Sequence, residues 1–395
     1  MKNKEAQEGP SKIKIILFRS GLILLAVLFG TILFWLLTMA GSKTKGPLDD
    51  FLASTNNDIS HLERSIISKE ESRASKMLWF TKYRDSKTLL NNTDTILLGA
   101  YDDRTAESYQ PIISFEDSLQ TKLGIISIYS AWGSKKSQVF PFLRAQAIYD
   151  LGSVPMITWE PWLDDFDVNI FPVLAGKKFK NVGGLKAIAE GKFDAYIDQW
   201  AQSAAQFGHP FFLRFAHEMN DPYRYPWGPP NNEPQDFINA WRYVTKRFQM
   251  HGADNALWVW SPHPAYETYP QFYPGKEYVD WIGTTALNYG SVASWSRWWS
   301  FDEIFGKFYD SVSLYKKPMM LTEFSSLAVG GDRAAWFTNA LDSLPQKYPA
   351  VKSVVFFHVT SDNTTSYKSL DWSFENDQRS KKAVKSAILG WTKGR

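Results

Sequence analysis

The stretch PFFLRFAHEMN, residues 210–220, decides the fold class, because a short apolar run ends abruptly in polar side chains. Its apolar part, 211–215, has the length and composition of a strand buried on both faces. Seven more runs of this kind occur along the chain, each bounded by Gly, Pro or polar residues. They are Thr95–Ala100, Gly124–Tyr129, Pro155–Trp159, Leu257–Trp260, Trp281–Thr285, Met319–Thr322 and Val354–Phe357.

Segments with helical spacing of apolar residues separate several of these runs. They are Phe142–Asp150, Phe193–Phe207, Pro234–His251, Phe301–Tyr315, Asp332–Lys347 and, at the end, Lys381–Trp391. Eight strands alternating with helices over about 300 residues predict a (β/α)₈ TIM barrel. A doubly wound open sheet is the alternative, but a Gly-rich phosphate turn would then be expected after the first strand, which instead continues LGAYDD, residues 98–103.

The region before the barrel divides into three parts. Residues 1–20 form a basic tail, and 21–40 are uncharged and mostly apolar, long enough to cross a bilayer as one transmembrane helix. A cleaved signal peptide is the competing interpretation, although its apolar core is usually shorter. Residues 41–93 are predicted to be a short helical stalk, either a spacer or a docking helix, and 94–395 the barrel domain. The positive-inside rule places the N-terminus in the cytoplasm of a single-pass cell-membrane protein and the barrel outside it.

Composition excludes several classes of function. Five of the 44 basic and two of the 41 acidic residues lie in 1–20, so the rest of the chain is neutral and offers no basic stripe for nucleic acid. The chain has no Cys, which excludes thiol nucleophiles and thiolate metal sites. The six His show no metalloenzyme spacing, and no phosphate loop or serine-hydrolase elbow occurs. We therefore expect neither a cofactor nor a catalytic metal.

Two glutamates follow predicted barrel strands. Glu218 ends the fourth strand and Glu323 the seventh, and active sites of such barrels lie at the carboxyl ends of the strands. Glycoside hydrolysis needs a pair of carboxyl groups, one that gives a proton to the leaving oxygen and one that attacks the sugar or activates water. A single Glu at a strand end usually caps a loop or pairs with Arg, but two at one barrel mouth favour this chemistry.

These motifs resemble those of glycoside hydrolase family 26. RFAHEMN, residues 214–220, is similar to the family's acid/base motif, and TEF, residues 322–324, to its nucleophile strand. Further landmarks appear in order as ITWEPW, residues 157–162, WVWSP, residues 258–262, and NYG, residues 288–290. The resemblance covers roughly residues 94–375. It implies a retaining (β/α)₈ enzyme in which Glu218 is the general acid/base and Glu323 the nucleophile.

The resemblance also implies roles for neighbouring residues. Arg214 would orient Glu323 and stabilise its charge, Tyr289 would donate a hydrogen bond to it, and His217 would contact the sugar or hold Glu323. Asn220 belongs to the same motif and would bind substrate. At the eighth strand the chain departs from the family's Trp-Phe-Asn, having FFH at 356–358 with His358 at its end, and Trp372 follows where relatives have Asp-Trp.

Aromatic residues support a carbohydrate substrate independently. Sugar rings stack on aromatic faces, and several Trp fall at or after predicted strand ends. A single Trp is more often a core residue, but the number here exceeds what a core needs. The expected platforms are Trp159, Trp162, Trp227 and Trp132.

Together these observations predict a membrane-anchored retaining endo-β-glycanase. The resemblance suggests mixed-linkage β-1,3-1,4-glucan or β-mannan as the polysaccharide, with a slight preference for glucan because of the eighth strand and the ITWEPW end of the third. The expected partners are this polymer, the lipid bilayer through residues 21–40 and, as a hypothesis, a membrane glycosyltransferase whose product the enzyme trims. The alternative is a non-catalytic glycan-binding or assembly subunit of a polysaccharide synthesis complex, since a barrel alone does not imply catalysis.

Overall fold

A computed structural model describes residues 28–31, 73–172, 180–363 and 368–393. The chain divides into two compact units, 1–63 and 64–395. In the first unit the described residues, 28–31, are helical. The predicted transmembrane helix lies mostly outside the described residues, as do the basic tail and residues 41–72 of the stalk. Among the residues that are described, no helix has the length and apolar character needed to cross a membrane.

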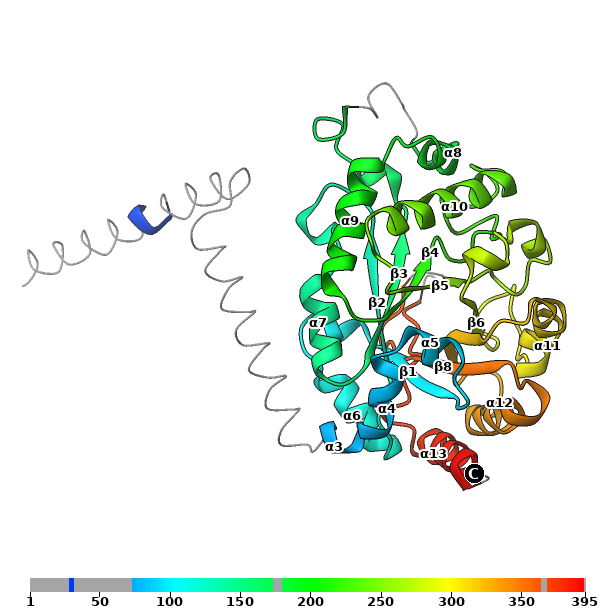
Figure 1. Ribbon diagram of the computed structural model, residues 1–395. Helices are drawn as coiled ribbons and strands as arrows, with labels where there is room; N and C mark the ends of the chain where they lie inside the picture. Colours follow the sequence, from blue (N-terminus) through cyan, green and yellow to red (C-terminus); the bar gives the residue numbers. More distant parts are fainter. Residues whose placement is uncertain (1–27, 32–72, 173–179, 364–367, 394–395) are drawn as a thin grey trace, which may run out of the picture. The chain divides into compact units, whose positions relative to one another are not determined.

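The second unit is a closed barrel of eight parallel strands in chain order, as predicted (Figure 1). The strands are β1 (Leu97–Tyr101), β2 (Ile125–Ala131), β3 (Val154–Glu160), β4 (Phe211–Phe215), β5 (Ala256–Trp260), β6 (Trp281–Asn288), β7 (Met319–Ser326) and β8 (Val351–Phe357). The barrel closes where β1 pairs with β8, Leu97 opposite Ser353. Each predicted strand is therefore present, and an open sheet is excluded.

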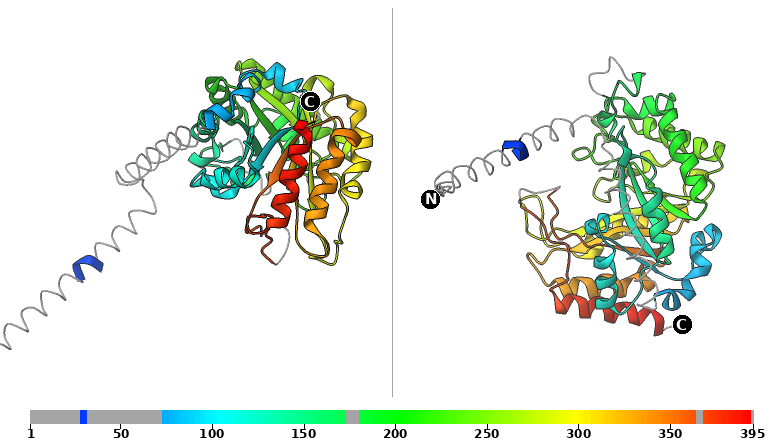
Figure 2. Two further views of the ribbon diagram at one scale, coloured as in Figure 1. Left: turned by 90° about the horizontal axis from the view of Figure 1, so that it is seen from below. Right: turned by 90° about the vertical axis from the view of Figure 1, so that its left-hand side faces the viewer.

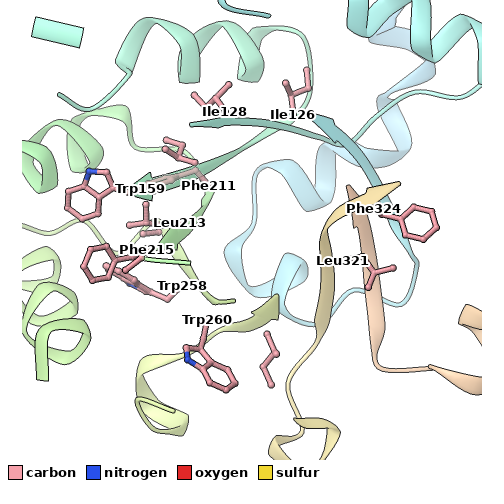
Figure 3. Packing of buried hydrophobic residues seen from close by; sticks show 14 of the residues in the cluster. Ile126, Ile128, Trp159, Phe211, Leu213, Phe215, Trp258, Trp260, Leu321 and Phe324 are labelled. Carbon is pink, nitrogen blue, oxygen red and sulfur yellow. The ribbon is translucent and has the colours of Figure 1, made fainter. Parts of the chain in front are cut away.

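Helices surround the strands (Figure 1). They are α6 (Gln110–Leu119), α7 (Phe142–Asp150), α8 (Gly184–Ala189), α9 (Asp194–Phe207), α10 (Pro234–Met250), α11 (Phe301–Val312), α12 (Arg333–Lys347) and α13 (Gln378–Lys393). Figure 2 shows α13 beside α12, so the C-terminal helix completes the outer ring. A large apolar cluster fills the layer between strands and helices, and Figure 3 shows part of it, including Trp159, Phe215 and Phe324.

A second apolar cluster fills the barrel interior at the end where the strands begin. It combines inward residues of the strands, such as Met156 and Val355, with Phe80 and Leu90 from two of three short helices that precede β1. These helices are α3 (Arg73–Lys76), α4 (Leu78–Arg84) and α5 (Lys87–Asn91). The Phe80 ring lies so close to Gly124 that a Cβ there would be only 2.8 Å from it.

Buried polar contacts fix the same three helices. The fully buried Arg73 donates to Glu116 (2.7 Å) and to Ser153 (2.9 Å), and Asn91 accepts from Trp281 Nε1 (2.9 Å). Residues 73–92 thus close the bottom of the barrel. This differs from the expected stalk over 41–93, because their apolar side chains belong to the barrel core.

Candidate active site

Glu323 reaches the barrel interior because β7 carries a bulge. Thr284 pairs with Leu321 but Thr285 pairs with Glu323, so Thr322 is an extra residue. Leu321 and Phe324 both face the helical layer although they are three residues apart, which strict alternation would not allow (Figure 3). The bulge turns Thr322 and Glu323 inward together, where both contact the same arginine on β4.

That arginine, Arg214, crosses the barrel interior and is fully buried. Its Nε donates to Thr158 (2.9 Å), its Nη1 to Thr322 (3.0 Å), and its Nη2 to Tyr129 (2.8 Å) and to Glu323 Oε1 (2.8 Å). Tyr129, on β2, also donates to Glu323 Oε1 (2.7 Å). These two hydrogen bonds to Glu323 therefore reach the same oxygen, Oε1.

The protonation of the two donors suits this arrangement. Burial lowers the pKa of Arg214, but the nearby Tyr129 and Glu323 outweigh it and raise the pKa overall. Burial, reinforced by the charge of Glu323, raises the pKa of Tyr129 well above its usual range. Tyr129 therefore keeps its proton and Arg214 its charge, and hydrogen bonds to a charged carboxylate are worth about 1.5–3 kcal/mol each.

Glu218 follows β4 in a strained turn. Ala216 and Glu218 both have left-handed backbone, with φ of 43° and 52°, which costs energy for residues other than Gly. The turn is held by hydrogen bonds from Ala216 N to Trp159 O (3.0 Å) and from Glu218 N to Ser261 O (2.7 Å). Hydrogen bonds to the end of β3 and to the residue after β5 thus hold the turn that carries Glu218.

The carboxylate of Glu218 is 1% exposed, and neither oxygen has a hydrogen-bond partner among the described residues. Arg224 Nη1 lies 3.8 Å from Oε2, close enough for charge attraction but beyond hydrogen-bond distance. Buried polar groups are rarely left unpaired, so an unpaired carboxyl group at a barrel mouth is suited to bond an incoming ligand. Glu323, at 6% exposed, lies nearly as deep.

His217, the residue before Glu218, is held by two aromatic residues of the loop that follows β4. Its Nε2 lies 2.9 Å from the Tyr225 hydroxyl, and its carbonyl accepts from Trp227 Nε1 (2.7 Å). Burial, together with the positive charges of Arg214 and Arg224, lowers the pKa of His217 well below its usual value. His217 is therefore neutral and is held by the loop that follows β4.

A third carboxylate, Glu160, ends β3 and was not among the predicted site residues. Trp162 Nε1 donates to its Oε2 (3.1 Å). Burial, together with the charge of Glu323, raises the pKa of Glu160. This effect is larger than the lowering of the pKa by the hydrogen bond from Trp162 and the charge of Arg214. The position of Glu160 at a strand end, within ITWEPW, could have identified it as a site residue. Arg224, a missed neighbour of Glu218, could have been identified by its place in the loop six residues after that glutamate.

The burial of the tryptophans corrects part of the aromatic prediction. Trp132 and Trp159 are fully buried, 4.5 Å apart between ring centroids, in the helical layer. They offer no face to a sugar and serve the core. Trp162 is half-buried and meets Trp227 edge to face at 5.3 Å, while Trp227 stacks on Tyr225 at 4.7 Å. Trp162 and Trp227 therefore remain beside the site, with Trp227 mostly covered.

Asn220 makes structural contacts. It is buried, its side-chain amide donates to the carbonyls of His263 (2.9 Å) and Tyr266 (2.8 Å), and its Oδ1 accepts from His263 N (2.8 Å). Its hydrogen-bonding capacity is thus directed to the backbone after β5. Instead of binding substrate, Asn220 holds that loop beside Glu218.

Three other predicted residues lie around β8 and β6. His358 is buried against Phe115 and pairs with Asp102 Oδ2 (3.0 Å), so it does not line the mouth. Trp372 is buried and donates to Asp362 (2.8 Å).

The ring of Tyr289 packs edge to face against Trp372 at 4.8 Å. The phenol of Tyr129 donates to Glu323, and the hydrogen bond that the resemblance implies from Tyr289 stays a prediction.

Two groups of side chains, within the parts of the chain that the structure describes, bring potential metal ligands within 4.8 Å of one another. They are Asp102, His358 and Glu375, and Glu218, Asp221 and His263. Arg104 already bridges Asp102 and Glu375, and Arg224 lies beside Glu218. A cation in either place would face a fixed guanidinium group.

Comparison with known proteins gives a consistent picture. The model of glycosyl hydrolase family 26 matches residues 179–369. Endoglucanase H of Acetivibrio thermocellus is 32% identical over 311 residues, which are 76% of this chain and 31% of that protein. A mannan endo-1,4-beta-mannosidase of Bacillus subtilis is 28% identical over 195 residues, 46% of this chain and 49% of the relative. The chain thus spans less than half the length of either relative.

Among solved structures, the GH26 beta-mannanase from Bacteroides ovatus superimposes with a TM-score of 0.54 at 18% identity, covering 81% of this chain and 93% of that one. Likeness at this identity establishes the shared barrel fold. The matched residues of the family model include both Glu218 and Glu323.

Proposed function

The chain belongs to glycoside hydrolase family 26, and from that membership and the geometry of its site we propose that it is a retaining endo-β-glycanase. The observation that carries the proposal is the pair of glutamates at one barrel mouth. Glu323 is held at Oε1 by Arg214 and Tyr129, and Glu218 is buried with both oxygens unpaired. Glu323, held in place by two donors, is suited to act as the nucleophile. Glu218, whose oxygens have no hydrogen-bond partner in the part of the chain that the structure describes, is suited to act as the general acid/base.

In the proposed reaction, Glu323 attacks the anomeric carbon with Oε2, since Oε1 is engaged by its two donors. The glycosidic C–O bond breaks as Glu218 gives its proton to the leaving oxygen, and a glycosyl ester of Glu323 forms. Glu218 then takes a proton from a water, which attacks the same carbon and releases Glu323. Two displacements return the original anomeric configuration.

The substrate we propose is a β-linked backbone glycan, with mixed-linkage β-1,3-1,4-glucan preferred over β-mannan. Two observations support this order. The relative named endoglucanase matches 76% of the chain at 32% identity, whereas the mannosidase matches 46% at 28%. At the end of β8, Phe356 stands in place of the family's Trp, and it is fully buried in the apolar layer between strands and helices.

The test is to incubate the detergent-solubilised full chain with mixed-linkage glucan, β-mannan, xylan and cellulose and to resolve the products by size. We expect glucan to be cut into mixed oligosaccharides, with Glu218→Gln and Glu323→Gln inactive and exposed Glu190→Gln unaffected as a matched control. If the unaltered chain binds glucan but releases no product, as both site variants would, the protein is a non-catalytic glycan-binding subunit.

The localisation we propose is a cell membrane, with residues 21–40 as a single uncleaved span, the N-terminus cytoplasmic and the barrel outside. The support is the length and apolar character of that stretch and the basic residues before it. A tethered glycanase is suited to trim a polymer made by a neighbouring membrane synthase. Co-purification with an integral glycosyltransferase would support this role, whereas a monodisperse monomer in mild detergent would count against it.

A further inference from the structure

An unusual surface lies on α4, at the end of the barrel opposite the catalytic glutamates. Phe80 and Tyr83 of α4 are buried against the barrel, but their neighbours Leu78 and Trp79 are 71% and 50% exposed. A side chain as large as Trp normally buries most of its surface. Here the sequence places a second apolar pair on the outer face of a helix whose inner face already fills the core.

Positive charge accompanies this apolar pair. Residues 73–92 contain five basic side chains and one acidic one. Arg73 is buried with Glu116, Arg84 pairs with Asp85, and Lys87 donates to the carbonyl of Ala256 (2.6 Å). Arg84 also lies over the ring of Tyr149 on α7, 4.3 Å from its centroid, so these contacts engage three of the five cations.

The two remaining cations, Lys76 and Lys82, are exposed. Lys82 lies three and four residues after Trp79 and Leu78, so it shares their face of α4. Lys76 ends α3 immediately before that helix. We define Lys76, Leu78, Trp79 and Lys82 as the basal patch.

We propose that the basal patch rests on the surface of an anionic lipid bilayer. Trp prefers the membrane–water interface, Leu gains by leaving water, and lysines are attracted to anionic headgroups. The inference rests on the membrane anchor proposed above. The 32 residues between 40 and 73 reach at most about 110 Å when fully extended, which keeps the patch near the bilayer.

This docking would give the enzyme an orientation. The basal patch lies where the strands begin, whereas Glu218 follows the end of β4 and Glu323 lies in the second half of β7. Resting on the patch would point the catalytic mouth away from the lipid, toward an extracytoplasmic polymer. Two lysines and two apolar side chains bind a membrane weakly by themselves, and the tether supplies the local concentration that makes such a contact effective.

The Cys-free chain allows a clean test. Leu78→Cys in the full chain is labelled with an environment-sensitive fluorophore, and the protein is reconstituted into nanodiscs of phosphatidylglycerol or of phosphatidylcholine. The matched control is Ile170→Cys, 59% exposed on the loop after β3. We expect a blue-shifted emission and quenching by nitroxide-labelled lipid at position 78, in phosphatidylglycerol only, and neither at 170.

Charge reversal completes the test. Lys76→Glu with Lys82→Glu should return the emission at position 78 to that of position 170, while hydrolysis of a small soluble aryl glycoside stays unchanged, which shows that the barrel is intact. The inference is overturned if the chain enters nanodiscs but the probe at 78 remains in water, or is shielded equally in both lipids without nitroxide quenching, as a protein contact would give. If the chain does not enter nanodiscs at all, the anchor itself is wrong and the docking falls with it, while the glycanase assignment is untouched.

Discussion

Arg214 and Glu323 come from strands three positions apart in the barrel, yet the guanidinium Nη2 lies 2.8 Å from Glu323 Oε1. The contact needs two things at once. Arg214 must cross the interior, where Thr158 and Thr322 hold it, and the bulge in β7 must turn Glu323 inward. The position of Glu323 therefore depends on side chains from several strands across the barrel and not on β7 alone.

Tyr129→Phe tests the second donor to this carboxylate. Losing one hydrogen bond to a charged group costs about 1.5–3 kcal/mol, so we expect kcat to fall about 10- to 150-fold. KM should change little if Tyr129 acts through Glu323. Steady-state kinetics on an aryl glycoside measure both, with Tyr149→Phe, on α7 and away from the site, as the control. Equal kinetics for the two variants would show that the Tyr129 contact is dispensable.

Azide should distinguish the two glutamates. In Glu218→Ala, azide can replace the activated water, so a substrate with a good leaving group should give a glycosyl azide of retained configuration. In Glu323→Ala, azide takes the place of the nucleophile and the azide product should be inverted. Nuclear magnetic resonance of the products reads the configuration. Exchanged outcomes would reverse the assigned roles.

Phe80→Ala tests whether residues 73–92 belong to the barrel. Phe80 is fully buried beneath it, so its removal should cost about 3–5 kcal/mol of unfolding free energy. Trp79→Ala, on the exposed face of the same helix, should cost no more than about 0.5 kcal/mol. Denaturant unfolding of both variants compares them. Equal and small losses would mean that the three short helices are an independent stalk after all.

His217 should make stability depend on pH in a defined direction. Because burial lowers its folded pKa below the ordinary 6.5, the unfolded chain takes up a proton first as pH falls. The contribution of neutral His217 is complete above pH 6.5 and is lost on acidification below it. The stability advantage over His217→Asn should therefore shrink below pH 6.5 by up to about 1.4 kcal/mol per pH unit. Parallel pH profiles for the two proteins would show that His217 is not held neutral.

The sequence pattern predicted the barrel well, because each strand is a self-contained apolar run. The fourth run, 211–215, coincides with β4, and helix 142–150 coincides with α7. Helix α6 was not predicted, since it is only ten residues long and begins with Gln110-Pro111, a pair that reads equally well as a turn. Glu218 was found because the end of β4 is readable from its apolar run, whereas Glu323, expected at the end of the seventh strand, lies inside β7, which continues to Ser326.

Features that depend on contacts across the barrel could not be predicted from the sequence. Strict alternation would have turned Glu323 away from the interior, and nothing in the sequence of β7 announces the bulge that brings it in. Burial was the second gap. Trp132 and Trp159 follow or end strands as platforms would, but the helical layer covers both, which only the packed structure reveals. The third was long-range pairing, which assigns Tyr129 to Glu323 and His358 to Asp102.

The most direct test of the proposed mechanism is to trap its covalent intermediate. The full chain is incubated with an activated 2-deoxy-2-fluoro β-glycoside of the preferred substrate, digested and analysed by peptide mass spectrometry. The account predicts a single fluorosugar ester on the peptide that contains Glu323, lost in Glu323→Gln and retained in Glu190→Gln. Turnover of the natural glycan without any adduct, and with inverted anomeric configuration in the first product, would contradict it.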